Sequence, residues 1–151
     1  MLTKIFVDIH EGLRQYSSMG IKPRRPTEAE LPILRVLWEH GPRSVREIHK
    51  ILAKANPDKP AGYTTVLKLL QIMTEKGLVT RDESQRPQIY QAAYSEQHTQ
   101  RQIAGDLLQR VFGGSVKALV LQALATTKST PEELEEMEKL LDRFEQQGGK
   151  K

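Results

Sequence analysis

The sequence contains no cysteine, which excludes disulfide bonds, thiolate metal sites and cysteine nucleophiles. Aromatic residues make up only 5% of the 151 residues. No stretch approaches the roughly 18 apolar residues of a membrane-spanning helix. The N-terminal stretch MLTKIFVDIHEG is interrupted by Asp8 and His10 too early for a signal peptide. These absences favour a soluble cytoplasmic protein that is not inserted in a membrane.

Catalytic signatures are also missing. The histidines His10, His40, His49 and His98 are scattered, and there is no HExxH motif, Gly-rich phosphate loop or GxSxG motif. The acidic run PEELEEME is better explained as the N-terminal charge of a helix than as a metal site. The sequence therefore predicts a protein that is not an enzyme and has no metal or other cofactor.

The net charge of +4 is unevenly distributed along the chain. Residues 22–92 contain thirteen Lys and Arg against eight Asp and Glu, whereas residues 93–151 contain eight against nine and residues 1–21 are balanced. A basic excess confined to the middle of the chain favours a polyanionic partner for that segment.

The first 19 residues have apolar side chains at helical spacing, and the stretch SSMGIKPRRP then breaks this pattern. Two interpretations are open. The segment is either a docking helix or an extension upstream of a natural start at Met19.

Three amphipathic helices are expected in the middle segment. Thr27 and Glu30 form a capping box that predicts the start of the first helix, although Pro32 is expected to tighten or kink its first turn. Ser44 and Glu47 form a second capping box. The inward-facing positions of these helices are Leu31, Leu34, Leu37 and Trp38, then Val45, Ile48, Ile51 and Leu52, and finally Val66, Leu69, Leu70 and Met73.

Gly77 is expected to end the third helix, after which the hydrophobic period changes from 3.6 to 2. The runs LVTRD and QIYQA, joined by ESQRP, are typical of a β-hairpin with a charged tip. A first helix, a helix–turn–helix and then a hairpin follow one another in the order that is typical of a winged helix. We therefore predict a mainly α fold with a small β-hairpin.

The face of the third helix opposite its apolar stripe carries Thr64, Lys68 and Gln71. Such side chains can hydrogen-bond phosphates, or base edges in the major groove of DNA. The alternative interpretation is an ordinary solvated face. Arg43, Arg46, Arg81 and Arg86, together with basic residues before the first helix, lie where a winged helix meets the DNA backbone. Together these features favour DNA as the partner.

Three further helices are expected over residues 95–112, 115–125 and from Thr130 onward. Their apolar stripes are narrow, and the last one has the 3, 4, 3 spacing of a coiled-coil seam. Because short helices with narrow stripes have little to bury against within one chain, we expect them to pair with a second copy. The predicted dimerisation residues are Leu107, Val111, Leu119, Val120, Leu134, Met137, Leu141 and Phe144.

The chain is thus predicted to comprise an N-terminal extension (1–21), a winged-helix DNA-binding domain (22–93), a helical dimerisation domain (94–147) and a flexible tail (148–151).

The segments RRPTEAELPILRVLWEHGPRSVREI, YTTVLKLLQIMTEKGLVTR and FGGSVKALV resemble the BlaI/MecI/CopY family of penicillinase repressors. The resemblance covers about residues 22–145 and leaves out residues 1–19. It implies a dimeric repressor whose winged helix binds half of a palindromic operator. By this resemblance Thr64, Thr65, Leu67 and Lys68 are positions of a recognition helix that meet DNA, and Arg81 and Arg86 belong to the wing. Tyr63 and Gln71 of the same helix complete the predicted DNA-binding set.

This chain departs from the family pattern at three points. Leu67 stands where relatives carry Arg, and the paired C-terminal cysteines of copper-responsive members are absent. The pair aligned with the Asn–Phe cleavage site of β-lactam-responsive members is Gln122-Ala123. Release by cleavage, through a membrane metalloprotease sensor pathway, is therefore implied by the resemblance but not supported by these residues.

Two other functions are compatible with a winged helix. One is a protein–protein interaction module without sequence-specific DNA binding, which the charge distribution and the Thr64, Lys68 and Gln71 face disfavour. The other is a non-specific chromosome-coating protein, which would need a larger basic excess than +4.

Overall fold

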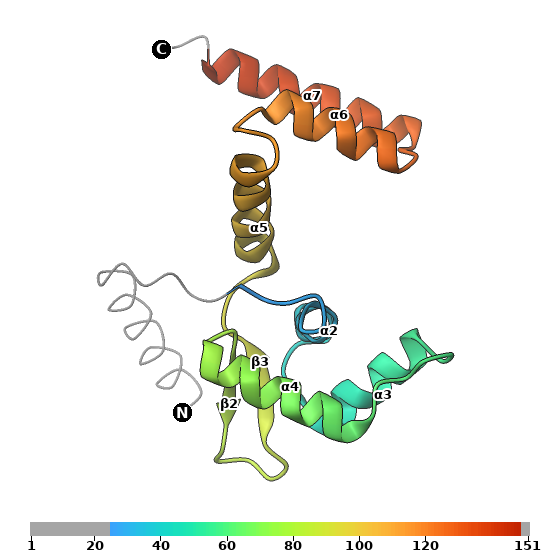
Figure 1. The fold of residues 1–151 in the computed structure, drawn as a ribbon, viewed down its shortest axis with the longest axis vertical. Coiled ribbons are helices and arrows are strands. Elements are labelled where there is room, and N and C mark those ends of the chain that lie inside the picture. Colours follow the sequence, from blue (N-terminus) through green and yellow to red (C-terminus); the bar gives the residue numbers. More distant parts are fainter. Residues whose placement is uncertain (1–24, 149–151) are drawn as a thin grey trace, which may run out of the picture. The chain divides into compact units, whose positions relative to one another are not determined.

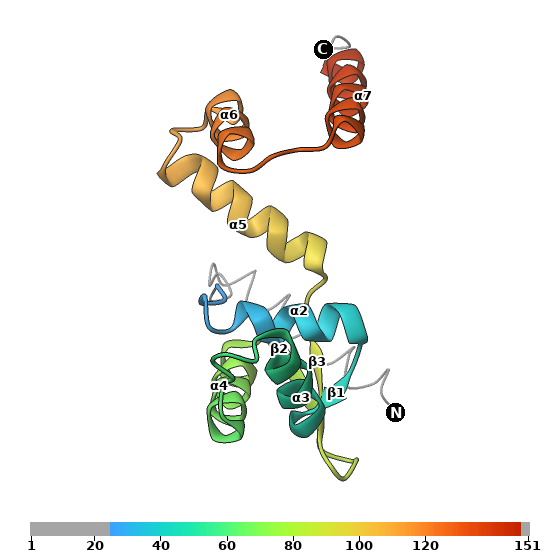
Figure 2. The same ribbon diagram turned by 90° about the vertical axis from the view of Figure 1, so that its right-hand side faces the viewer.

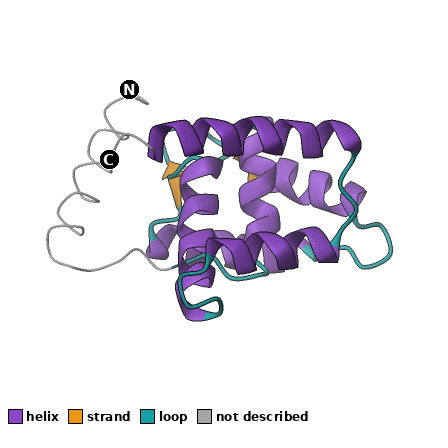
Figure 3. Ribbon diagram, turned by 90° about the horizontal axis from the view of Figure 1, so that it is seen from above, coloured by secondary structure: helices purple, strands orange, loops and turns teal. Residues whose placement is uncertain are grey.

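A computed structural model describes residues 25–148. The predicted N-terminal extension and most of the predicted tail lie outside the described residues. The elements, in chain order, are α2 (Leu31–His40), β1 (Arg43–Ser44), α3 (Val45–Ala55), α4 (Tyr63–Lys76), β2 (Val79–Asp82), β3 (Ile89–Ala92), α5 (Glu96–Arg110), α6 (Val116–Thr126) and α7 (Pro131–Gly148). Figure 1 shows them along the chain, and Figure 3 shows that helices predominate over short strands in the described part.

The described chain divides into two compact units, one that ends at residue 103 and one that begins at residue 104. The first unit contains α2, α3, α4, the sheet and the beginning of α5, and its helices α2 to α4 and its sheet follow the order predicted for a winged helix. The predicted mainly α fold is confirmed. Within residues 25–148, no helix combines the length and the apolar character that crossing a bilayer requires.

The start of α2 differs from its prediction. The Glu30 carboxylate accepts a hydrogen bond from the Thr27 N–H at 3.2 Å, but no side-chain cap forms and the helix begins only at Leu31. Pro32 is therefore the second residue of the helix, where its missing N–H has no intrahelical partner to lose. The expected kink is consequently not required. The Glu30 side chain instead turns inward, where it is 2% exposed and pairs with the Lys76 ammonium at 2.6 Å.

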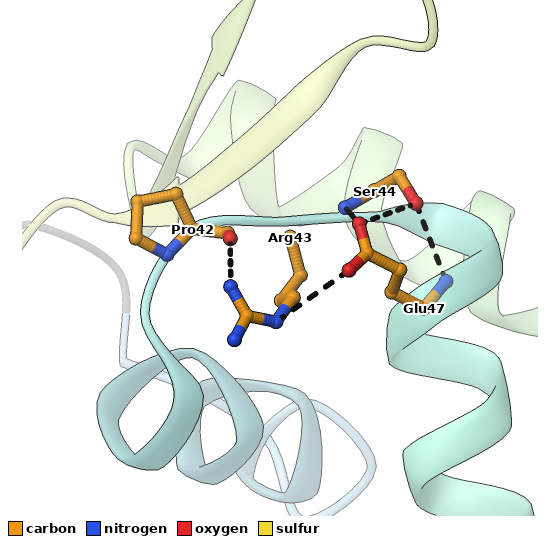
Figure 4. A network of polar contacts seen from close by, with 4 residues as sticks. All are labelled: Pro42, Arg43, Ser44 and Glu47. Atoms are coloured by element: carbon orange, nitrogen blue, oxygen red, sulfur yellow. Dashed lines mark hydrogen bonds and ion pairs between the residues drawn. The ribbon is translucent and has the colours of Figure 1, made fainter.

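The start of α3 agrees with its prediction. The Ser44 hydroxyl accepts from the Glu47 N–H at 3.3 Å, and the Glu47 carboxylate accepts from the Ser44 N–H at 3.2 Å (Figure 4). These two bonds satisfy donors that would otherwise be unpaired at the helix start. The end of α4 is also as predicted, because Gly77 has a φ of 81°, a left-handed conformation that glycine adopts without strain.

The sheet has three antiparallel strands in the order β1-β3-β2, one more than the predicted hairpin. β2 and β3 form that hairpin, with Arg81 opposite Tyr90. β1 adds to the other side of β3 by pairing Arg43 with Tyr90. β1 was not predicted, because two residues are too few to show the period-2 pattern of a strand.

The core of this unit lies between the helices and the sheet (Figure 2). Its buried residues are Ile33, Leu34, Val36, Leu37, Val45, Ile48, Val66, Leu70, Met73, Leu78, Val79 and Tyr90. Ile51, Leu52 and Leu69 are partly buried against this core, as their helical spacing predicts. The indole N–H of Trp38 donates to the Tyr94 carbonyl at 2.9 Å and so fixes the segment that follows β3.

The second unit contains α6 and α7. Ser115 caps α6 by accepting from the Ala118 N–H at 3.1 Å, and Thr130 caps α7 by accepting from the Glu133 N–H at 3.1 Å. None of the side chains of residues 104–147 is buried. Local capping therefore defines these helices, while their apolar stripes form no buried core among residues 104–147.

Candidate nucleic-acid interface

The outward face of α4 carries the predicted DNA-reading side chains. Thr64, Thr65, Lys68 and Gln71 are exposed, whereas Val66, Leu70 and Met73 on the opposite face are 0% exposed. Among the described residues, none forms an ion pair or a hydrogen bond with the Lys68 ammonium. This face therefore offers a cation and several hydrogen-bonding groups to a partner.

The start of α4 is suited to an anion. Gly62 precedes the helix without a side-chain cap, and the first turn has no acidic residue. Its free N–H groups and the positive end of the helix dipole therefore remain available to phosphate. Beside them, Tyr63 is 46% exposed and its ring meets the His49 imidazole edge-on at 5.9 Å between centroids. The contact orients an aromatic side chain at the edge of the outward face.

The two arginines beside the start of α3 differ in their surroundings. Arg43 donates to the Pro42 carbonyl at 2.8 Å and lies 3.6 Å from the Glu47 carboxylate, as Figure 4 shows. Arg46 is exposed, and no described residue pairs with it. The hydrogen bonds from Ser44, assisted by the Arg43 charge, hold the pKa of Glu47 below its ordinary value. Arg46 is therefore the more available of the two cations.

The two arginines of the hairpin also differ in whether a described residue pairs with them. Arg81 pairs with Glu83, and its pKa is raised, first by a hydrogen bond with Tyr90 and then by Glu83. Arg86 is exposed and has no ion-pair partner among the described residues. Arg81 thus stabilises the hairpin internally, whereas Arg86 projects a charge from its tip.

The turn that carries Arg86 is held by Asp82. Its carboxylate accepts hydrogen bonds from the Ser84 N–H at 3.0 Å and from the Gln85 amide at 2.9 Å. The hydroxyl of Ser84 also donates to this carboxylate. These bonds, that of the Ser84 hydroxyl first, lower the pKa of Asp82. The tip is therefore a hydrogen-bonded turn rather than an unsupported loop.

A cleft of about 580 Å³ lies between the start of α3, the first turns of α4 and the hairpin tip. It is lined by Ser44, Val45, Arg46, Tyr63, Leu67, Arg86, Pro87 and Gln88. Four predicted residues thus come together here, whereas Arg43 and Arg81 do not line the cleft. Ser44, Val45, Pro87 and Gln88 were not predicted as site residues, because only tertiary packing brings α3 and the hairpin tip beside α4.

The family described as Penicillinase repressor matches residues 26–143. The chain belongs to this family. Its members are transcriptional repressors, so this penicillinase-repressor-family protein is a DNA-binding regulator of transcription and not an enzyme. The resemblance seen in the sequence is confirmed.

Two curated relatives have the same name. The chain is 24% identical over 116 residues to the penicillinase repressor of Bacillus licheniformis, a match that covers 77% of this chain and 88% of the relative. It is 24% identical over 114 residues to the penicillinase repressor of Staphylococcus aureus, covering 76% and 88%. Among solved structures, a MarR family protein from Bacillus stearothermophilus superposes with a TM-score of 0.44 and 19% identity over 98% of this chain and 93% of that chain.

The C-terminal helices of this family member present the predicted dimerisation residues to solvent. Leu107, Val111, Val120, Leu134, Leu141 and Phe144 are exposed, and Leu119 and Met137 are half-buried. Four further exposed apolar residues were not among the predicted dimerisation residues: Val116, Leu121, Leu124 and Leu140. Apart from Tyr63, all the large exposed apolar side chains of the described chain lie in this region.

Gln122 and Ala123, the pair aligned with the family's cleavage site, are exposed within α6. Their peptide bond is in helical conformation, and a protease would have to unwind the helix locally to reach it. Over residues 25–148, no group of three or more His, Asp or Glu side chains is arranged to hold a metal ion.

Proposed function

We propose that this chain is a homodimeric repressor that binds a palindromic operator and sterically blocks a promoter. One observation carries the proposal: the exposed face of α4, where Lys68 has no partner among the described residues, lies beside a cleft that bears Arg46 and Arg86. Such a surface combines groups that read base edges with cations that neutralise phosphates. Family membership supports the same function.

The proposed mechanism uses two copies of the chain. The winged helix over residues 22–93 supplies one half-site contact, with α4 in the major groove and Arg86 at the backbone. The helices over residues 94–147 join two such domains, so that the second contact becomes intramolecular and the overall affinity rises. A repressor of this kind works in the cytoplasm, where a bacterial chromosome lies.

Release is proposed to act on the C-terminal region. Any event that separates the two chains would remove the gain in DNA affinity that comes from joining two half-site contacts. Such an event is either cleavage near Gln122 and Ala123 or binding of another protein. The α4 face would be unchanged. The exposed apolar side chains of α6 and α7 support this region as the place where such a signal acts.

The experiment that tests the function is fluorescence anisotropy of the purified protein on its own promoter fragment and on scrambled DNA, over a salt series. We expect selective binding to the promoter fragment. A plot of the logarithm of the association constant against the logarithm of the salt concentration should have a slope of about −4 to −5, as about five phosphate contacts require. Equal binding to both DNAs would indicate a coating protein. A complex with protein but not with DNA, insensitive to salt, would indicate the interaction module.

Lys68→Ala is expected to weaken operator binding about tenfold or more, because the exposed ammonium has no other partner among the described residues. The same variant should melt like the parent, since its side chain contributes nothing to the core. Glu75→Ala, on the same face and also exposed, is the control that should not weaken DNA binding. A large loss of thermal stability in Lys68→Ala would instead assign Lys68 a structural role.

A further inference from the structure

The cleft between α3, α4 and the hairpin tip is lined by apolar side chains, by the polar side chains of Ser44 and Gln88, and by two arginines. Val45, Leu67, Pro87 and the ring of Tyr63 supply apolar lining. Arg46 and Arg86 line it from α3 and from the hairpin, and no carboxylate is among the lining residues. Because no described residue pairs with these two guanidinium groups, the cleft is complementary to a ligand that carries both an anionic group and an apolar group.

Leu67 connects this cleft to the outward face of α4. It lies one helical turn after Tyr63, which also lines the cleft, and it directly precedes the exposed Lys68. Its side chain is half-buried, so part of it remains open to a partner. A leucine cannot hydrogen-bond a base edge, and the apolar group that the major groove offers is the 5-methyl of thymine.

The two arginines of the cleft suit the rest of the same nucleotide strand. A thymine whose methyl contacts the apolar lining would carry a phosphate on each side, and cationic side chains bind phosphates. Arg46 and Arg86 come from two different elements that line the cleft. The cleft is also continuous with the α4 face, because Tyr63 and Leu67 belong to that helix.

We infer that Leu67 is a specificity-determining residue, and that the cleft receives the 5-methyl group of one thymine in each operator half-site. Arg46 and Arg86 hold the phosphates of that strand. This inference rests on the proposed function and deepens it, because it names a base that the operator must contain.

The test replaces each thymine of the operator in turn by deoxyuridine, which removes only the methyl group. Anisotropy is measured with the full-length protein and both half-sites changed together. Burying one methyl group corresponds to about a fourfold effect on affinity, so a change in both half-sites is expected to weaken binding roughly 15-fold at one symmetric position. Replacement at thymines outside the cleft should have little effect.

Protein variants then assign that position to Leu67. With Leu67→Ala, the ratio of affinities for thymine and deoxyuridine at this position should fall to about one, whereas Leu67→Met, which keeps an apolar side chain of similar volume, should retain it. Thr64→Ser, which removes another methyl group from the same helix, should also retain it. Since the readout is a ratio of two affinities, a partial loss of folded protein does not change it.

Failure of this inference can be separated from failure of the proposed function. No selective binding to unmodified operator would refute the function itself. Selective binding with no thymine whose replacement matters would refute the inference alone and leave the cleft to a different occupant. A thymine effect that persists in Leu67→Ala, or that disappears in Thr64→Ser, would also overturn it by placing the methyl contact elsewhere.

Discussion

Replacing Leu141 and Phe144 together by glutamate is expected to dissociate the protein into monomers and to lower operator affinity by about 100-fold or more. These side chains are 64% and 68% exposed on α7, at the seam spacing that predicts pairing with another helix. No side chain of residues 104–147 is buried, so the apolar stripes of this unit have no core of their own. In the proposed dimer, two introduced carboxylates would be buried without partners, at a cost that pairing cannot offset.

The measurement combines sedimentation equilibrium for the association state with anisotropy on the operator. Arg143→Glu is the matched control, because it changes the net charge by the same two units at an exposed position between the two altered residues. The control should remain dimeric and bind DNA. If the double variant stays dimeric, the α7 seam is not the dimer interface. If it becomes monomeric yet binds as tightly as the parent, dimerisation is not the source of affinity.

Features that depend on neighbouring residues were predicted well. The capping box of Ser44 and Glu47 and the C-cap at Gly77 each need only a few consecutive residues, and both are observed. The burial of Val66, Leu70 and Met73 follows from helical spacing in the same way. Because these three residues face the core, Lys68 on the opposite side of the helix faces outward. The fold and the exposed face of α4 could therefore be derived from the sequence.

Features that depend on distant residues could not be derived. β1 exists because Arg43 pairs with Tyr90, and α3, α4 and β2 separate these two residues in the sequence. The cleft likewise joins α3, α4 and the hairpin tip. The sequence pattern also treated four arginines alike, whereas Arg43 and Arg81 are engaged by nearby carboxylates. Charge composition counts cations, but only tertiary structure shows which of them are available.

The ion pair between Glu30 and Lys76 is the clearest long-range interaction that the sequence concealed. The two carboxylate oxygens of Glu30 accept from Lys76 at 2.6 Å and from the Thr27 N–H at 3.2 Å. Their side chains are only 2% and 14% exposed. Lys76 is the last residue of α4, so this pair links the end of the proposed recognition helix to the start of α2. The capping-box pattern identified Glu30 but gave it only a local role.

Lys76→Met is expected to lower the free energy of unfolding by about 3 kcal/mol, because the Glu30 carboxylate would remain buried without its counter-charge. For a domain of this size such a loss corresponds to a melting temperature lower by roughly 10–20 °C, measured by circular dichroism. The double variant Glu30→Leu with Lys76→Met should recover most of it, since a buried pair replaced by apolar side chains is often neutral. Lys139→Met breaks an exposed pair with Glu135 and should have little effect. Equal melting of Lys76→Met and Lys139→Met would show that the buried pair does not hold α4 in place.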